Sequence, residues 1–318
     1  MKRFIIAGLI ILTTIAATAA PFSADRVAAG AKWVAYADFD TARDTKSGEF
    51  VMGELTEGKA AERFEAFKAI FNFDPRKDIH SLTVYGTDMR GDDGIMLVDA
   101  DFDKERLITL AQANDTYTKT MFGNVEIHSW IDNHHHHRCG RVNERAFSCF
   151  ASDGTMILGD SSELVINALN VIEGSQPSLE SGSLLDLSEQ TGSPFFVAAL
   201  DVPENGDIPA HAAIIRQSKN VIFSVKEEDD QLRGTLVLNT DDEETALRVD
   251  AIVKGMWAMA LLHEQDCPRL TELTQNLQVE TKDSQVKVEV ACSVDKMIEM
   301  LKAAVQEHIN TKGKWNNI

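Results

Sequence analysis

Two strand-like runs, His80-Ser-Leu-Thr-Val-Tyr-Gly-Thr87 and Gly94-Ile-Met-Leu-Val-Asp-Ala-Asp101, decide the fold class. Both are rich in residues that favour β-strands, and the turn-rich segment Asp88-Met-Arg-Gly-Asp-Asp93 separates them. We therefore predict a hairpin of two antiparallel strands. Asp103 follows it directly and has the position of an N-cap for a helix over residues 104–113.

The elements around this hairpin recur in the same order later in the chain. In the first half, hydrophobic spacing predicts the following elements: a strand at residues 33–39, a helix within 47–71, strands at 125–131, 145–151 and 155–159, and a helix at 164–172. In the second half the matching runs are 194–202, 220–227, 231–239, 241–262, 277–282, 285–291 and 294–309. Capping-box spacing at Asp160 with Glu163, and at Thr240 with Glu243, predicts where two of these helices begin.

We therefore predict an α+β fold made of two tandem related units. Each unit has the order β-α-β-β-α-β-β-α, with antiparallel sheets covered by helices. The expected organisation is a signal peptide at residues 1–20, a first unit at 21–174, a Ser/Gly-rich linker at 175–193 and a second unit at 194–318. A chance recurrence of common elements is the alternative. The sequence leaves open whether the two units form one body.

The first twenty residues have the layout of a secretory signal peptide. Lys2 and Arg3 precede an apolar run, and Ala17-Thr18-Ala19 offers a small-x-small cleavage site. An uncleaved membrane anchor is the alternative. We expect export to the periplasm or the extracellular space, with no transmembrane segment after cleavage.

The composition is that of an acidic globular chain. Hydrophobic residues make up 44% of it and the mean hydropathy is −0.17. Without Lys2 and Arg3 the basic residues fall from 31 to 29, and against 50 acidic residues the net charge becomes about −21. Nucleic-acid binding starts from a basic surface, so the charge argues against that class of partner. An unidentified protein or small ligand remains as the expected partner.

The stretch Asn133-His-His-His-His-Arg-Cys-Gly140 is the best candidate for a metal site. Four imidazoles, at His134, His135, His136 and His137, stand beside the thiol of Cys139, and such donors suit zinc, copper or nickel. The alternative is a solvated polar loop, because structural metal sites usually take their ligands from well-separated rigid positions. We therefore assign no cofactor with certainty and no catalytic residue.

Four cysteines, Cys139, Cys149, Cys267 and Cys292, are candidates for disulfides in an exported protein. Four cysteines allow three connectivities. The pairing of neighbours, Cys139 with Cys149 and Cys267 with Cys292, closes the shortest loops and is our first choice.

Two further motifs fail on inspection. The run from Asp99 to Asp103 resembles the start of a calcium loop, but Lys104 stands where glycine is needed and Leu110 where glutamate is needed. Ser293-Val-Asp-Lys296 has the Ser-x-x-Lys spacing of penicillin-recognising enzymes, but no Lys-Thr-Gly follows it. Strand ends and helix caps explain both runs.

The pattern "DIHSLTVYGTD…GIMLVDADFD", followed by "FASDGTMILGDSSELVINAL", resembles uncharacterised secreted bacterial proteins of the domain-of-unknown-function type. The resemblance implies an exported α+β protein and supplies no catalytic residues. We expect a non-enzymatic binding or accessory protein of the bacterial cell envelope. A periplasmic metal-binding protein that uses the histidine run, and an enzyme whose site is not recognisable from sequence, are the alternatives.

Overall fold

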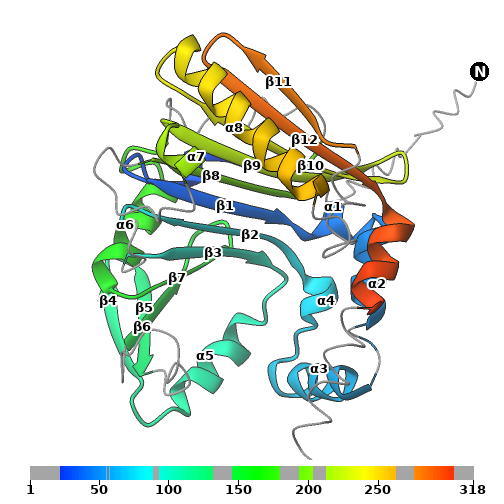
Figure 1. Ribbon diagram of the computed structural model, residues 1–318. Helices are drawn as coiled ribbons and strands as arrows, with labels where there is room; N and C mark the ends of the chain where they lie inside the picture. The colour runs from blue at the N-terminus through cyan, green and yellow to red at the C-terminus, as the bar shows by residue number, and fades with distance from the viewer. Residues whose placement is uncertain are drawn as a thin grey trace, which may run out of the picture.

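The computed structural model describes residues 22–54, 56, 58–88, 93–131, 145–179, 193–202, 213–262 and 276–303. Twelve strands form one antiparallel sheet in the order β11-β12-β10-β9-β8-β1-β2-β3-β7-β6-β5-β4 (Figure 1). The strands are β1 (Trp33–Asp38), β2 (Ile79–Gly86), β3 (Ile95–Ala100), β4 (Thr118–Phe122), β5 (Val125–Ile131), β6 (Arg145–Phe150), β7 (Met156–Gly159), β8 (Phe196–Asp201), β9 (Asn220–Glu228), β10 (Gln231–Asn239), β11 (Gln278–Lys282) and β12 (Gln285–Ser293). The α+β class and the antiparallel pairing are confirmed.

The helices lie on both sides of this sheet. They are α1 (Phe39–Arg43), α2 (Lys46–Glu54), α3 (Gly58–Phe71), α4 (Pro75–Asp78), α5 (Lys104–Gln112), α6 (Ser162–Ile172), α7 (Ala213–Arg216) and α8 (Glu243–Leu262), with a short 3-10 turn at Ala24–Arg26 and a helix at residues 294–303. Within the described ranges, no helix is both long enough and apolar enough to span a bilayer.

The predicted hairpin is confirmed as β2 and β3. Tyr85 pairs with Ile95 and Leu82 pairs with Val98 in an antiparallel register. Because side chains alternate between the two faces of a strand, Tyr85 and Ile95 share one face, and both are buried. The side chains of this hairpin that share the face of Tyr85 and Ile95 therefore belong to the core, whereas Met96 on the other face is exposed.

The two halves of the chain meet at the centre of the sheet. Strand β1 pairs with β2 on one side and with β8 on the other, so Tyr36 stands opposite both Thr83 and Val197. This pairing places residues from both halves in one continuous hydrogen-bonded ladder. The halves are therefore parts of a single sheet.

One face of the sheet, which we call the α6 face, is apolar in the first half. The register aligns Cys149, Ile157, Leu97, Thr83 and Tyr36 across five strands. Helix α6 buries Val165, Ala168 and Leu169 in the same hydrophobic cluster, and the segment at residues 27–31 joins it. In the second half this row continues as Ser224, Thr235 and Glu289, which are polar.

The opposite face, which we call the pocket face, is apolar across both halves. Its central row runs through Leu158, Met96, Val84, Ala35, Ala198, Phe223, Leu236, Val288 and Val279. In the second half α8 lies along this face (Figure 1) and buries Ala246 and Val249 against Leu238 and Val286. In the first half α5 packs against β5 and against α3.

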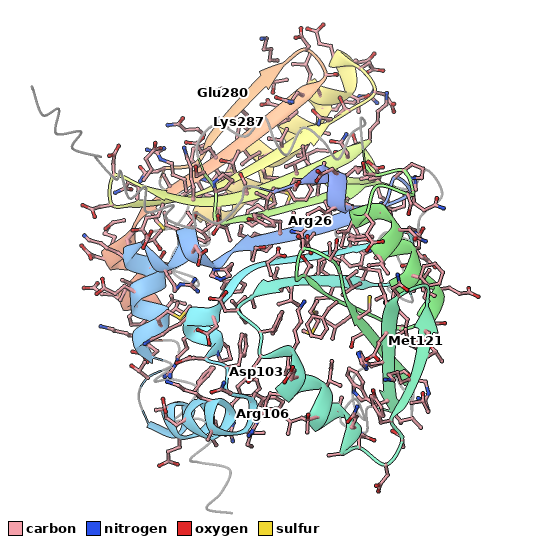
Figure 2. All side chains as sticks on the ribbon, turned by 180° about the vertical axis from the view of Figure 1, so that it is seen from behind. Arg26, Asp103, Arg106, Met121, Glu280 and Lys287 are labelled. Carbon is pink, nitrogen blue, oxygen red and sulfur yellow. The ribbon has the colours of Figure 1, made fainter. Side chains whose placement is uncertain are left out.

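Several helix starts differ from the prediction by one or two residues. The cap at Asp103 is confirmed, since its carboxylate accepts a hydrogen bond from the backbone N–H of Arg106 at 3.0 Å (Figure 2 labels both). Helix α6 is instead capped by Ser161, whose hydroxyl accepts from the N–H of Leu164 at 3.2 Å. In α8 the carboxylate of Asp242 accepts from the N–H of Thr245 at 2.7 Å.

Two further differences concern the first half. The predicted helix within residues 47–71 is divided into α2 and α3, and α1 precedes them. Strand β4 was not predicted, because all five of its residues are exposed and its sequence does not alternate between apolar and polar. It forms one edge of the sheet, and Met121, on this outer strand, is 58% exposed (Figure 2).

Candidate functional site

A cavity of about 450 Å³ opens between α5 and the pocket face of the first half. Helix α5 contributes Leu107, Ile108, Leu110 and Ala111, and Phe71 closes it from the end of α3. The sheet contributes Trp130, Phe150, Met156 and Leu158. Ligand-binding cavities of this size are typically lined by apolar side chains with a few polar groups, which is the composition found here.

The sheet register explains why these residues meet. His128 on β5 stands opposite Ser148 on β6, and Ser148 stands opposite Leu158 on β7. Trp130 lies two residues after His128 on the same strand and therefore faces the same side. Three consecutive strands thus present their side chains to one space beneath α5.

Three polar side chains line the cavity. They are Asn114, just beyond the end of α5, and His128 and Ser148 on the sheet. The amide oxygen of Asn114 accepts hydrogen bonds from the backbone N–H and the hydroxyl of Thr116, at 2.9 and 2.7 Å. No hydrogen bond joins the Ser148 hydroxyl to another described residue, and Ser148 is 6% exposed.

His128 is the ionisable group of this cavity. It is 3% exposed, and its Nδ1 lies 2.8 Å from the hydroxyl oxygen of Tyr117. Its Nε2 is 3.9 Å from a carboxylate oxygen of Glu126, which is beyond hydrogen-bonding distance. Burial lowers the pKa of His128, more than the charge of Glu126 raises it, so the ring is neutral at pH 7.

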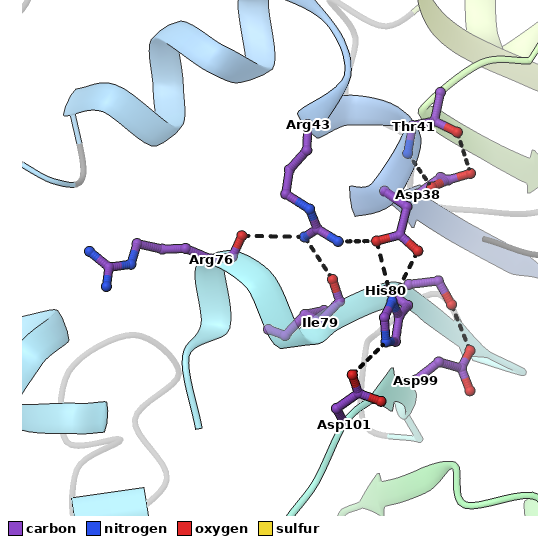
Figure 3. Close-up of polar contacts among 10 residues, drawn as sticks. Asp38, Thr41, Arg43, Arg76, Ile79, His80, Asp99 and Asp101 are labelled. Carbon is purple, nitrogen blue, oxygen red and sulfur yellow. Dashed lines mark hydrogen bonds and ion pairs between the residues drawn. The ribbon is translucent and has the colours of Figure 1, made fainter. Parts of the chain in front are cut away.

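A second polar group surrounds His80 (Figure 3). Its Nδ1 lies 2.9 Å from Asp40 at the start of α1, and its Nε2 lies 3.4 Å from Asp101, which precedes α5. Arg43 also binds Asp40 and donates to the carbonyl oxygen of Ile79 at 2.9 Å. Burial by itself would lower the pKa of His80, but Asp40 and Asp101 together outweigh it and raise the pKa.

This second group connects elements of the fold. His80 lies at the start of β2, and its two carboxylate partners come from α1 and from the segment that leads into α5. No local pattern indicates that His80 has partners, because Asp40 is 40 residues away in the chain. We interpret the cluster as a tether that fixes α1 and the start of α5 to the central hairpin.

The aspartates near the rejected calcium loop have structural partners. Asp99 receives hydrogen bonds from Arg26 at 2.9 and 2.8 Å, from Ser81 at 2.6 Å and from Thr155 at 2.8 Å. Figure 2 shows Arg26 beside the central strands. Among the described residues, no group of three or more histidine, cysteine or acidic side chains is placed to hold a metal ion.

The predicted metal ligands His134, His135, His136, His137 and Cys139 lie outside the described residues. The metal site therefore stays a prediction. The signal peptide at residues 1–20, and the linker from residue 180 to 192, lie outside the described ranges as well.

Two of the four cysteines are described. Cys149 and Cys292 are buried with free thiols. Seven strands stand between β6 and β12 in the sheet, so these two cysteines cannot pair with each other. Their predicted partners, Cys139 and Cys267, lie outside the described residues, and the neighbour pairing stays a prediction.

No protein-family model matches this chain, and no curated protein matches it either. Crystal form III of TP0453 is similar in structure, with a TM-score of 0.51 and 7% identity over 90% of this chain and 99% of that chain. Crystal form IV gives 0.49 and 8% over 89% and 97%, and crystal form I gives 0.47 and 8% over 90% and 98%. At 7% identity, the first of these likenesses shows the fold alone.

The cavity residues were missed by reasoning from the sequence. His128 belongs to no sequence motif, and Ser148 is 20 residues away from it in the chain. The alternation of His128 and Trp130 on one strand was the only local signal. Only the pairing of β5 with β6 brings Ser148 beside this histidine.

Proposed function

We propose that this chain is an exported, non-enzymatic binding protein that holds an apolar small molecule in the cavity beneath α5. The observation that carries this proposal is the cavity of about 450 Å³ with its apolar lining. Burial of apolar surface is the main driving force for such binding. The sequence predicts a binding role without identifying a ligand, and we propose that the ligand binds in this cavity.

The support comes from how the cavity is built. Its walls belong to paired strands and to a helix that packs against them, so its shape exists without a ligand. The aromatic rings of Phe71, Trp130 and Phe150 offer large, flat contact surfaces. A ligand that fills this space would remove from water both its own apolar surface and that of the wall.

The test uses a neutral, polarity-sensitive dye, Nile red, and a variant that fills the cavity. In Ala111→Trp the indole would enter the cavity from α5, because Ala111 lines it. The matched control is Ala113→Trp, at the exposed C-cap of the same helix. We expect Nile red affinity to fall at least tenfold in Ala111→Trp and to stay within twofold in the control. Equal affinities in all three proteins would refute the proposal.

A second candidate function is that of an enzyme that uses Ser148 and His128, since both residues line the same cavity on adjacent strands. A serine nucleophile needs a histidine within about 2.6–3.2 Å, and no hydrogen bond joins these two side chains among the described residues. Steady release of p-nitrophenol from p-nitrophenyl esters, abolished in Ser148→Ala, would establish the enzyme. We expect no turnover above the rate of the Ser148→Ala variant.

Export is proposed on the layout of residues 1–20. The measurement is fractionation of cells that express the full chain, followed by sequencing of the N-terminus of the recovered protein. We expect the protein outside the inner membrane without Lys2 and Arg3. Recovery of the intact N-terminus from the cytoplasm would contradict this expectation.

We also propose that the two halves are related units. Strands β1 and β8 each begin a half, and each is followed by a hairpin, β2–β3 or β9–β10. In each half the last strand, β7 or β12, returns to pair with the third strand, β3 or β10. The β4–β5 hairpin is then an addition to the first half. Superposition of experimental coordinates of the two halves should overlay these four strands in the same order.

A further inference from the structure

The polar groups of the cavity define what a ligand can carry. Among the described residues that line it there is no lysine, arginine, aspartate or glutamate. The polar members are Asn114, His128 and Ser148, and the amide oxygen of Asn114 is already bound by Thr116. The groups left to meet a ligand can each donate a hydrogen bond: an imidazole, a hydroxyl, an amide N–H and the indole N–H of Trp130.

The surroundings of His128 favour one of the two neutral forms of its ring. The negative charge of Glu126, 3.9 Å from Nε2, favours a hydrogen on Nε2. The hydroxyl of Tyr117 then donates to Nδ1 at 2.8 Å. Nε2–H has no hydrogen-bond partner within the described residues, although the side chain is 4% exposed. Because His128 lines the cavity, a ligand or a water molecule there can accept a hydrogen bond from this N–H.

An anionic head group would be poorly held here. It would give up its hydration shell in an apolar cavity without a cation to replace it. His128 does not supply that cation at neutral pH, because burial lowers its pKa. The carboxylate of Glu126, which is bound to Lys119 at 2.6 Å, lies 3.9 Å from Nε2 of His128 and would repel a negative charge placed beside this nitrogen.

We propose that the cavity selects an uncharged apolar molecule with one carbonyl oxygen, which accepts hydrogen bonds from Nε2–H of His128 and from the hydroxyl of Ser148. The two donors lie on directly paired positions of β5 and β6, so they approach one oxygen from adjacent strands. The apolar body of the ligand then lies against Leu107, Trp130 and Phe150. This inference rests on the proposed function and names the ligand class for that same cavity.

The test compares three ligands that share a chain length: 2-undecanone, undecane and undecanoate. Each displaces Nile red from the full-length mature protein at pH 8, where a carboxylic acid is ionised. We expect the ketone to bind about three- to tenfold more tightly than the alkane, which is the factor that one hydrogen bond supplies. We expect it to bind at least tenfold more tightly than the carboxylate.

Two variants assign the effect to the two donors. His128→Phe keeps an aromatic ring and removes both nitrogens, and Ser148→Ala removes the hydroxyl. In each variant we expect the ratio of ketone affinity to undecane affinity to fall toward one, because only the ketone uses the lost donor. The undecane measurement is the control, because it reports on an intact cavity in a folded protein.

Each outcome of this experiment either supports or overturns the proposed ligand class. A carboxylate that binds as tightly as the ketone, or a ketone that binds no more tightly than the alkane, overturns the inference and leaves the proposed function standing. Unchanged ketone affinity in both variants overturns it as well. Failure of all three ligands to displace the dye, with Ala111→Trp behaving like wild type, removes the proposed function and the inference with it.

Discussion

Single residues in this chain take their roles from partners that lie far away in sequence. His128 has its Nδ1 bound by Tyr117, and its pocket neighbour Ser148 comes from another strand. His80 lies between two carboxylates, one of them on α1. Neither histidine stands out in the sequence, whereas the run from His134 to His137 does. Local composition therefore indicates the histidine run as a candidate site, whereas the tertiary structure indicates His80 and His128.

The stability that His80 contributes should depend on pH. Asp40 and Asp101 raise the pKa of His80, so the folded state binds a proton more tightly than the unfolded chain. The contribution is therefore complete below the usual histidine pKa and is lost as the pH rises through the raised value. We expect His80→Asn to lower the free energy of unfolding by up to about 1 kcal/mol at pH 5.5, the size typical of partly exposed ion pairs, and by less at pH 8.5.

Urea denaturation of both proteins at the two pH values measures this difference. The control variant is His211→Asn, which makes the same replacement at a histidine outside the described residues. An equal loss at both pH values would show that His80 acts through packing and that its charge contributes nothing.

The histidine run is tested by calorimetry with zinc, copper and nickel. The variant replaces His134, His135, His136 and His137 with alanine, and the protein carries no purification tag. If the run is a site, the wild type binds with micromolar or tighter affinity and the variant loses that binding. Equal heats in the two proteins would identify the run as a solvated loop.

The secondary-structure elements follow local signals closely where those signals are strong. The β2–β3 hairpin and the cap at Asp103 form as the sequence predicts, because turn residues and a capping carboxylate act over a few positions. The start of α6 moves by one residue to Ser161, since its hydroxyl reaches the N–H of Leu164. Strand β4 is not predicted, because it is an exposed edge strand. Burial of one face therefore does not impose an alternation of apolar and polar residues on it.

The cap of α6 gives a prediction at this scale. Ser161→Ala removes the acceptor for the Leu164 N–H, and we expect a loss of about 1 kcal/mol in the free energy of unfolding. The control is Ser152→Ala, an exposed serine in the turn between β6 and β7. It should change stability by less than about 0.5 kcal/mol. Equal effects of the two substitutions, measured by urea denaturation, would show that the cap contributes nothing.

The whole molecule is organised by the β1–β8 ladder. Its register carries both the α6 face and the pocket face from one half into the other. Val34, Val197 and Ala199 belong to the same buried cluster, so each half covers apolar surface of its neighbour. The chain carries a net charge of −19. Its two halves contribute side chains to the same hydrophobic cluster.

We therefore expect the two halves to unfold together. Hydrogen exchange monitored by mass spectrometry should give the same midpoint in urea for peptides from β6 in the first half and β10 in the second. In Val197→Asp a charge would enter this cluster next to β1, and both midpoints should fall by the same amount. Two separate transitions in the wild type would show that the halves are independent domains.

By itself, the sequence determined the α+β class, the central hairpin and the helix cap at Asp103. These features depend on alternation, turn residues and capping side chains, all of which act between residues a few positions apart. The tertiary structure alone decided that the halves share one sheet, which histidine is buried and where the cavity lies. Those features depend on strand register, which joins His128 to Ser148 and Tyr36 to Val197 across chain separations that no local pattern specifies.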